Sequence, residues 1–195
     1  MSEPDRLHAN VLANPEPDEP RVAYANEVAA SDPARAELVR VQLANTRSRR
    51  AQEPAGSRTH GYTRESVLLE QHKDAWARPV TDIPGIQFVK FYRGFVEQVR
   101  MSARDFLAHG ERLYGRAPVL HLDLVELKPL AAEVFQSPLL ARIHSMRLWR
   151  NQLGDREMAL LAASPHVGRL RWLDLTYNEI GNAGIEALSA SSNMF

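Results

Sequence analysis

Residues 170–180 of this 195-residue chain have the sequence LRWLDLTYNEI, with apolar residues at the first, fourth, sixth and eleventh positions and asparagine at the ninth. The same pattern occurs 27 residues earlier, at residues 143–153 (IHSMRLWRNQL). The segments that follow also align, Leu161 with Leu188 and Ser164 with Ser191. A third, less regular unit begins at Val119, spans 24 residues and has leucine where asparagine is expected. Self-similarity at a fixed period of this length indicates a stacked repeat architecture.

Each unit combines a short strand with a returning helix. The apolar residues of the strand point inward, and the helix covers them from the outer side. Asn151 and Asn178 come at the ends of the strands, where an amide side chain can bond backbone groups that the turn leaves unpaired. One unit cannot bury its apolar face alone, so neighbouring units must stack. We therefore expect an α/β fold with parallel strands on a concave face and helices outside.

These units resemble the leucine-rich repeat family, and their long period resembles its ribonuclease-inhibitor-like subtype. The resemblance covers residues 119–195, with an incomplete last unit, and residues 95–118 are similar to an N-terminal variant of the same unit. It implies a short solenoid. Residues 14–25 (NPEPDEPRVAYA) and 32–43 (DPARAELVRVQL) are similar to the repeat-companion domain, a short bacterial helical module found in front of leucine-rich repeats. The chain departs from that module at residues 26–28, where NEV replaces its usual DWL. Both resemblances imply an architecture and no reaction.

Local signals divide the chain into five segments. Turn chemistry at residues 14–18 and the Asp32-Pro33 cap predict a helical domain over residues 1–46. Residues 47–62 are polar, basic and rich in proline and glycine, which predicts a flexible linker. Residues 63–85 are predicted as a helix, capped by Thr63, and a connection. Residues 86–118 are predicted as an N-terminal cap, in which β-type runs at 86–91 and 95–101 form a hairpin and Ser102 caps a helix. The repeats occupy residues 119–195.

Alternation along the repeat strands predicts which side chains line the concave face. Arg147 is expected between Asp123 and Asp174 of the adjacent strands, with two tryptophans beside it. Arginine with aromatic residues is typical of protein-binding hot spots. The alternative interpretation is a local ion-pair ladder with tryptophans half-covered by their neighbours. The predicted partner-binding residues are His121, Asp123, Ser145, Arg147, Trp149, Trp172, Asp174 and Thr176.

Several classes of function lack their sequence signals. The 24 basic and 24 acidic side chains cancel, which makes nucleic acid an unlikely partner despite the basic segment at 47–62. The chain has no cysteine, and no two of its seven histidines have the spacing of a helical metal pair. Phosphate-loop, dinucleotide and nucleophile-elbow motifs are absent from the sequence. We expect no catalytic residue, no cofactor and no metal site.

The sequence thus favours a non-enzymatic adaptor that binds another protein on its concave face. One alternative is a regulator of an enzyme such as a small GTPase, because long-period leucine-rich repeats resemble those of GTPase activators. Another is a structural subunit of a larger bacterial assembly that self-associates through the C-terminal edge of the repeats. Residues 1–5 lack the basic and apolar segments of a signal peptide, and no apolar run is long enough for a membrane span. We therefore expect a cytoplasmic protein with no membrane partner.

Overall fold

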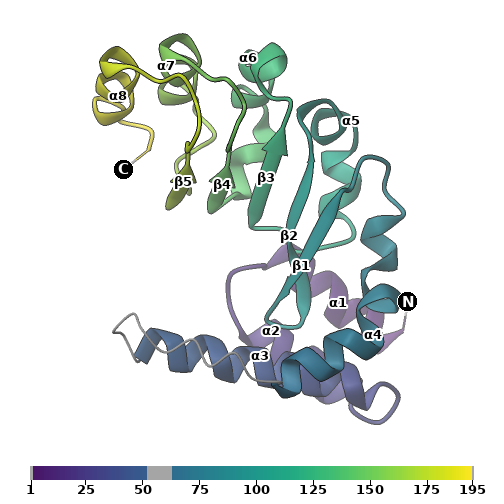
Figure 1. Ribbon diagram of the computed structural model, residues 1–195. Helices are drawn as coiled ribbons and strands as arrows, with labels where there is room; N and C mark the ends of the chain where they lie inside the picture. The colour runs from purple at the N-terminus through teal and green to yellow at the C-terminus, as the bar shows by residue number, and fades with distance from the viewer. Residues whose placement is uncertain (1, 52–62, 195) are drawn as a thin grey trace.

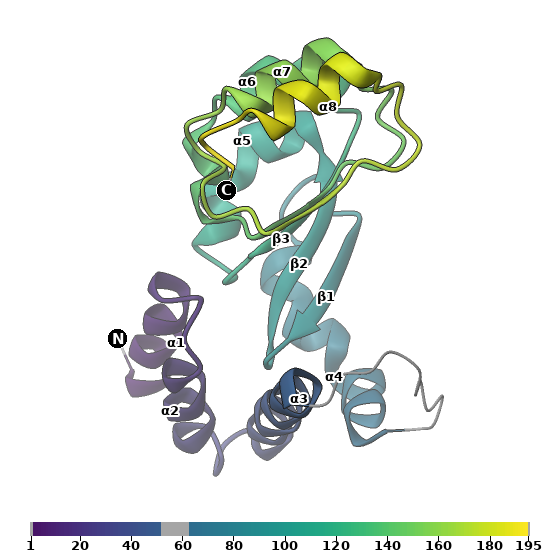
Figure 2. The same cartoon turned by 90° about the vertical axis from the view of Figure 1, so that its left-hand side faces the viewer.

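The computed structural model describes residues 2–51 and 63–194 and confirms the predicted α/β class. These residues form eight α-helices and a five-stranded sheet of order β1-β2-β3-β4-β5. The first strand pair is antiparallel, and the other three pairs are parallel. Helices α1 to α4 gather at one end of the molecule, and α5 to α8 lie in a row along one side of the sheet (Figures 1 and 2). In the described part of the chain, no helix has the length and apolar character needed to cross a membrane.

Two helices of the helical end begin at the caps expected from the sequence, since Asp32 and Thr63 each accept a hydrogen bond from a backbone N–H in the first turn of the helix that follows. Ser2 caps the first helix in the same way, which was not predicted from the sequence. The prediction that the helix ends at residue 46 is wrong, because it continues through residues 47–51 of the predicted linker. Those residues, RSRRA, contain no helix breaker, since the first proline comes at residue 54. The remainder of the linker, residues 52–62, lies outside the described residues. The helices are α1 (Glu3–Ala13), α2 (Glu19–Glu27), α3 (Pro33–Ala51) and α4 (Arg64–Thr81).

A tight hairpin connects this end to the rest of the sheet. It consists of β1 (Phe88–Tyr92) and β2 (Phe95–Ser102), with Arg93 and Gly94 at the turn in the left-handed region (φ 48° and 86°). A Cβ atom on Gly94 would lie 2.2 Å from the Cγ2 of Val39 in α3. The hairpin tip therefore approaches α3 so closely that only glycine fits.

Beyond the hairpin, strand–turn–helix units follow one another. Leu122, Met146 and Leu173 are cross-strand neighbours; the first two are fully buried, and Leu173 is partly exposed. Short 3₁₀ helices, η1 (Lys128–Leu130) and η2 (Pro138–Arg142), flank α6. The other elements are α5 (Ala103–Tyr114), β3 (His121–Val125), α6 (Ala131–Phe135), β4 (Ser145–Arg147), α7 (Asp155–Ala162), β5 (Trp172–Asp174) and α8 (Asn182–Ser189).

Asn151 and Asn178 join successive units as expected for asparagines at the strand ends. The Asn151 side chain donates to the Leu124 carbonyl (2.8 Å) and accepts from the Leu127 N–H (2.8 Å). Asn178 repeats this one unit later, donating to the Leu148 carbonyl (2.9 Å) and accepting from the backbone N–H of Asn151 (3.1 Å). Each amide therefore satisfies backbone groups of the preceding unit that lie beyond the reach of the strand ladder.

The core is continuous through the sheet and α5 to α8, and a second cluster joins α1, α2 and α3 to Phe95. Burial declines toward the last unit, in which Leu173, Leu175 and Leu188 are only partly buried and Ile185 is 55% exposed. Met194 packs into the large core, and Phe195 lies outside the described residues.

Candidate functional site

The predicted site residues lie on one face of the sheet, and the strand register arranges most of them in two rows. One row runs through Lys90, Gln98, His121, Ser145 and Trp172. The other row runs through Phe88, Arg100, Asp123, Arg147 and Asp174. The alternate residues between them are apolar and are buried except for the partly exposed Leu173, so both rows face away from the core.

The second row is a ladder of alternating charges. The Arg100 Nε lies 3.5 Å from the nearer carboxylate oxygen of Asp123, and Arg147 lies 3.9 Å from Asp123 and 3.5 Å from Asp174. Neither guanidinium donates a hydrogen bond to any described residue. Burial raises the pKa of Asp123, although both guanidiniums act against it. The hydroxyl of Thr176 holds the pKa of Asp174 below its usual value. The structure thus brings Asp123, Arg147, Asp174 and Thr176 together and leaves arginine donors unused.

The two tryptophans have different surroundings. Trp149 packs edge-on against Tyr177, with ring centroids 5.8 Å apart, and Arg150 lies over both rings at 4.8 and 5.5 Å. Trp172 is 51% exposed and has no ring or cation–π contact in the described part of the chain. Trp149 therefore fits the interpretation of a half-covered ring, whereas Trp172 is an open apolar surface.

Sequence reasoning missed Arg150 and Tyr177, although the repeat itself carries the signal. The two residues are 27 positions apart and precede the paired asparagines. Both adopt left-handed backbone angles (φ 56° and 57°), as does Glu126 of the irregular unit (φ 56°). Such angles are uncommon outside glycine, and here they mark the same turn in three units. This turn places Tyr177 (70% exposed) next to Trp149 and extends the aromatic surface.

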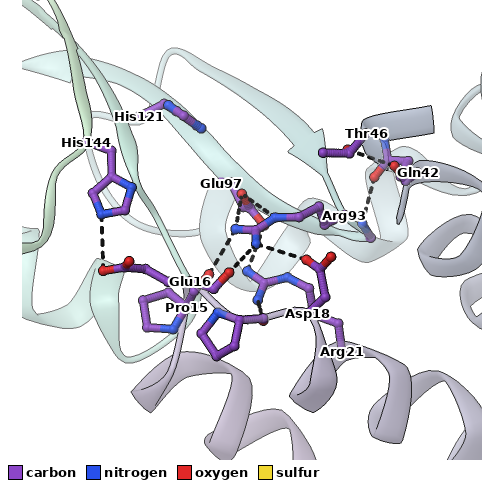
Figure 3. A network of polar contacts seen from close by, with 12 residues as sticks. Pro15, Glu16, Asp18, Arg21, Gln42, Thr46, Arg93, Glu97, His121 and His144 are labelled. Carbon is purple, nitrogen blue, oxygen red and sulfur yellow. Dashed lines mark hydrogen bonds and ion pairs between the residues drawn. The ribbon is translucent and has the colours of Figure 1, made fainter. Parts of the chain in front are cut away.

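His121 lies at the end of β3 near the helical elements (Figure 3), and its neighbour Ser145 on β4 is in turn the cross-strand neighbour of Trp172. The His121 Nδ1 and the Ser145 hydroxyl are 2.7 Å apart. Burial, helped by nearby His144 and Arg93, lowers the pKa of His121 to about 4, so its ring is neutral at pH 7. Both histidines line a cavity of about 330 Å³ between the α1–α2 loop and the strands. His144 lies 3.3 Å from the carboxylate of Glu16, which also pairs with Arg169 at 2.8 Å.

A buried charge cluster closes this cavity on the helical side (Figure 3). Glu97 accepts hydrogen bonds from Arg21 at 2.7 Å and from Arg93 at 2.9 Å. Arg93 also donates to the backbone carbonyls of Pro15 (2.9 Å) and Glu16 (2.6 Å). These bonds tie the α1–α2 loop to the hairpin. Both carboxylate oxygens of Glu97 are paired with guanidinium groups, so the cluster fixes the position of the helices, although the buried Nε of Arg21 has no hydrogen-bond partner among the described residues.

Comparison with known proteins adds no relative, since no family model, curated protein or solved structure matches the chain. In the described residues, no group of three or more histidines, aspartates or glutamates is arranged to hold a metal ion. One face of the sheet presents exposed aromatic rings, arginines with unused donors and carboxylates. These groups are suited to non-covalent binding of a partner through ring contacts, hydrogen bonds and ion pairs.

Proposed function

We propose that the chain is a protein-recognition module, built as a short leucine-rich-repeat solenoid, that binds a partner on the exposed face of its sheet. The solenoid is supported by the strand–turn–helix units, the left-handed residue common to three of them and the asparagines that join them. The exposure of Trp172 carries the functional part. A tryptophan that leaves half of its surface in water contributes only part of its ring to the packing of the fold, and such rings are frequent anchors in interfaces.

The groups around Trp172 suit a protein surface. Trp149, Tyr177 and Arg150 form a second aromatic cluster, and Arg147 is 46% exposed with its donors free for a partner's carbonyl or carboxylate oxygens. The charges of the ladder cancel within the row, so it attracts neither strongly acidic nor strongly basic ligands at long range. Affinity would then depend mainly on burial of the aromatic rings, with arginine hydrogen bonds fixing orientation.

The test compares single substitutions in the full chain. A tagged chain is used to recover binding proteins from a lysate of the source organism, and each purified candidate is titrated by calorimetry. Trp172→Ala is expected to weaken binding by about 2 kcal/mol or more, roughly 30-fold. Ile185→Ala is the matched control, because Ile185 is equally exposed but lies on α8. Equal affinities for Trp172→Ala and the wild-type chain would contradict the proposal.

A second candidate, self-association through the last unit, is favoured by one observation. Among the described residues, β5 has a strand neighbour on one side only, and Leu173 and Leu175 behind it are partly exposed. Open strand edges with apolar surface promote pairing between chains. Light scattering over a wide concentration range would test this, and a constant monomer mass would exclude it.

A further inference from the structure

A second cavity, of about 220 Å³, lies within the helical end and is separate from the exposed face of the sheet. Residues of α1, α2, α3 and α4 line it, together with the start of β2 and the loop before β3. Its polar lining consists of His8, Tyr24, Asp32, Arg35, Trp76 and Arg116. The cavity is therefore enclosed by segments distant in sequence, and it carries more cationic than anionic side chains.

Arg35 is the unusual member of this lining. The residue is 8% exposed, and its guanidinium lies over the rings of Trp76 (5.1 Å), Phe95 (5.1 Å) and Phe91 (5.5 Å). Its Nη1 is buried and has no hydrogen-bond partner, and it forms no ion pair with a described residue. Arg21 makes the contrast clear, since it is also fully buried but is paired with Glu97 at 2.7 Å.

The acid closest in sequence does not neutralise Arg35. One oxygen of Asp32 accepts the backbone N–H of Arg35 at 2.9 Å, which caps α3. The other oxygen accepts the indole N–H of Trp76 at 3.3 Å. Asp32 thus fixes the start of the helix and one aromatic wall of the cavity, and among the described contacts it forms no ion pair with Arg35.

A buried cation without a counter-ion is costly, and ring faces compensate only part of that cost. Burial lowers the pKa of Arg35, with Tyr24 and Asp32 acting in the opposite direction. His8 adds no further positive charge, because burial and the nearby charge of Arg35 lower its pKa. Arg116 adds a second positive charge to the cavity wall. An anion in the cavity would provide the charge that the protein lacks at this position.

We propose that this cavity binds a small organic anion, a carboxylate or phosphate group carried on a single flat ring. The anionic group would lie beside Arg35 and Arg116, and the ring would pack among Tyr24, Trp76 and Phe95. The size limits the ligand, since cavities for drug-sized molecules are about 300–1,000 Å³ and this one is smaller. The site is independent of the partner-binding face, because the two share no lining residue.

The indole N–H of Trp76 can report ligand binding by NMR, because Trp76 lines the cavity. The chain has only three tryptophans, so their indole signals are readily distinguished. Nitrogen-15 NMR spectra of the full chain are recorded during titration with benzoate, phenyl phosphate and the neutral benzamide. Saturable movement of the Trp76 signal with an anion, but not with benzamide, is expected at millimolar concentrations. The signals of Trp149 and Trp172 should not move. A response to benzoate alone or to phenyl phosphate alone would identify the anionic group.

Two variants separate binding from folding. Arg35→Met keeps the length of the side chain without its charge, and it is expected to weaken anion binding at least about tenfold. Arg116→Met is expected to weaken anion binding less. The matched control Arg156→Met changes an exposed residue of α7 and is expected to leave anion binding unchanged. Because Arg35 has no ion-pair partner among the described residues, Arg35→Met should fold with a melting temperature equal to that of the wild-type chain or higher. Absence of a saturable Trp76 shift in the wild-type chain, or unchanged affinity in Arg35→Met, would overturn the proposal.

Discussion

The two ends of the molecule place their buried polar groups in different ways. In the helical end, Glu97 meets Arg21, which is 76 positions away in sequence, and Gln42 meets Gly94, 52 positions away. In the strand–turn–helix units, buried polar side chains reach the preceding unit, so the separations stay near the repeat length. Ser164 and Ser191 illustrate this, because each hydroxyl donates to a carbonyl 29 positions earlier. The units are therefore joined by hydrogen bonds that recur at the repeat spacing, whereas the helical end is held by individual long-range contacts that do not recur.

The largest expected effect comes from breaking the buried ion pairs of Glu97 in the helical end. Glu97→Ala leaves the buried guanidiniums of Arg21 and Arg93 without their carboxylate, which should reduce the free energy of unfolding by about 3–5 kcal/mol. Urea denaturation followed by circular dichroism measures this change. Glu97→Gln retains an acceptor and should lose less, and Glu133→Ala, at an exposed position on α6, should lose almost nothing. Similar stabilities for Glu97→Ala and Glu133→Ala would show that the charge cluster does not hold the helical end.

Asn151 and Asn178 make equivalent hydrogen bonds in successive units, so the contribution of these bonds can be measured at two positions. Asn151→Ala leaves the N–H of Leu127 and the carbonyl of Leu124 unpaired inside the protein, and we expect a loss of about 2–3 kcal/mol. Asn178→Ala removes an equivalent set of bonds, but that site is only part-buried and water can replace them. The loss there should be about 1 kcal/mol.

Both variants can be compared by thermal and urea unfolding, with Asn182→Ala at an exposed position as the control. A larger loss of unfolding free energy in Asn178→Ala than in Asn151→Ala would show that burial does not determine how much these hydrogen bonds contribute.

The difference between recurring contacts in the units and long-range contacts in the helical end also explains how much of the structure the sequence could predict. The period placed Asp123, Arg147 and Asp174 in adjacent strands, and the α/β class and the caps at Thr63 and Ser102 followed from local signals. The period also contained Arg150 and Tyr177, but strand alternation does not extend into a turn of left-handed residues, so it does not predict where these side chains lie. No local signal reports that Glu97 pairs with Arg21, or that the Arg35 guanidinium forms no ion pair with a described residue, since both depend on how distant helices pack.

The end of helix α3 shows a second reason for failure. Basic residues at 47–51 suggested a solvated linker, yet arginine is a good helix former, and nothing in that stretch ends a helix that has already begun. Composition alone therefore did not predict the backbone conformation of this segment. The binding role of the exposed sheet face remains a prediction, because chain topology places side chains on a surface without identifying what they bind.

A modest, pH-dependent effect is expected from His121, where the helical end and the units meet. Its pKa is lowered to about 4 in the folded chain, from an ordinary value near 6.5. Between these values the unfolded chain binds more protons, so stability should rise with pH and fall as the pH decreases through this window. We expect the wild-type chain to lose about 1–2 kcal/mol between about pH 7 and about pH 5 on account of this ring.

The pKa values of His8 and His144 are lowered as well, so the slope for the whole chain has several sources. His121→Gln isolates one of them, because it keeps a polar group near the Ser145 hydroxyl and removes the titration. Urea unfolding of both proteins across the pH range gives the difference directly. Parallel stability curves would mean that His121 titrates normally and that the cavity between the two ends is open to water. A shallower curve for the variant would show that packing of the helices against the sheet keeps this ring neutral.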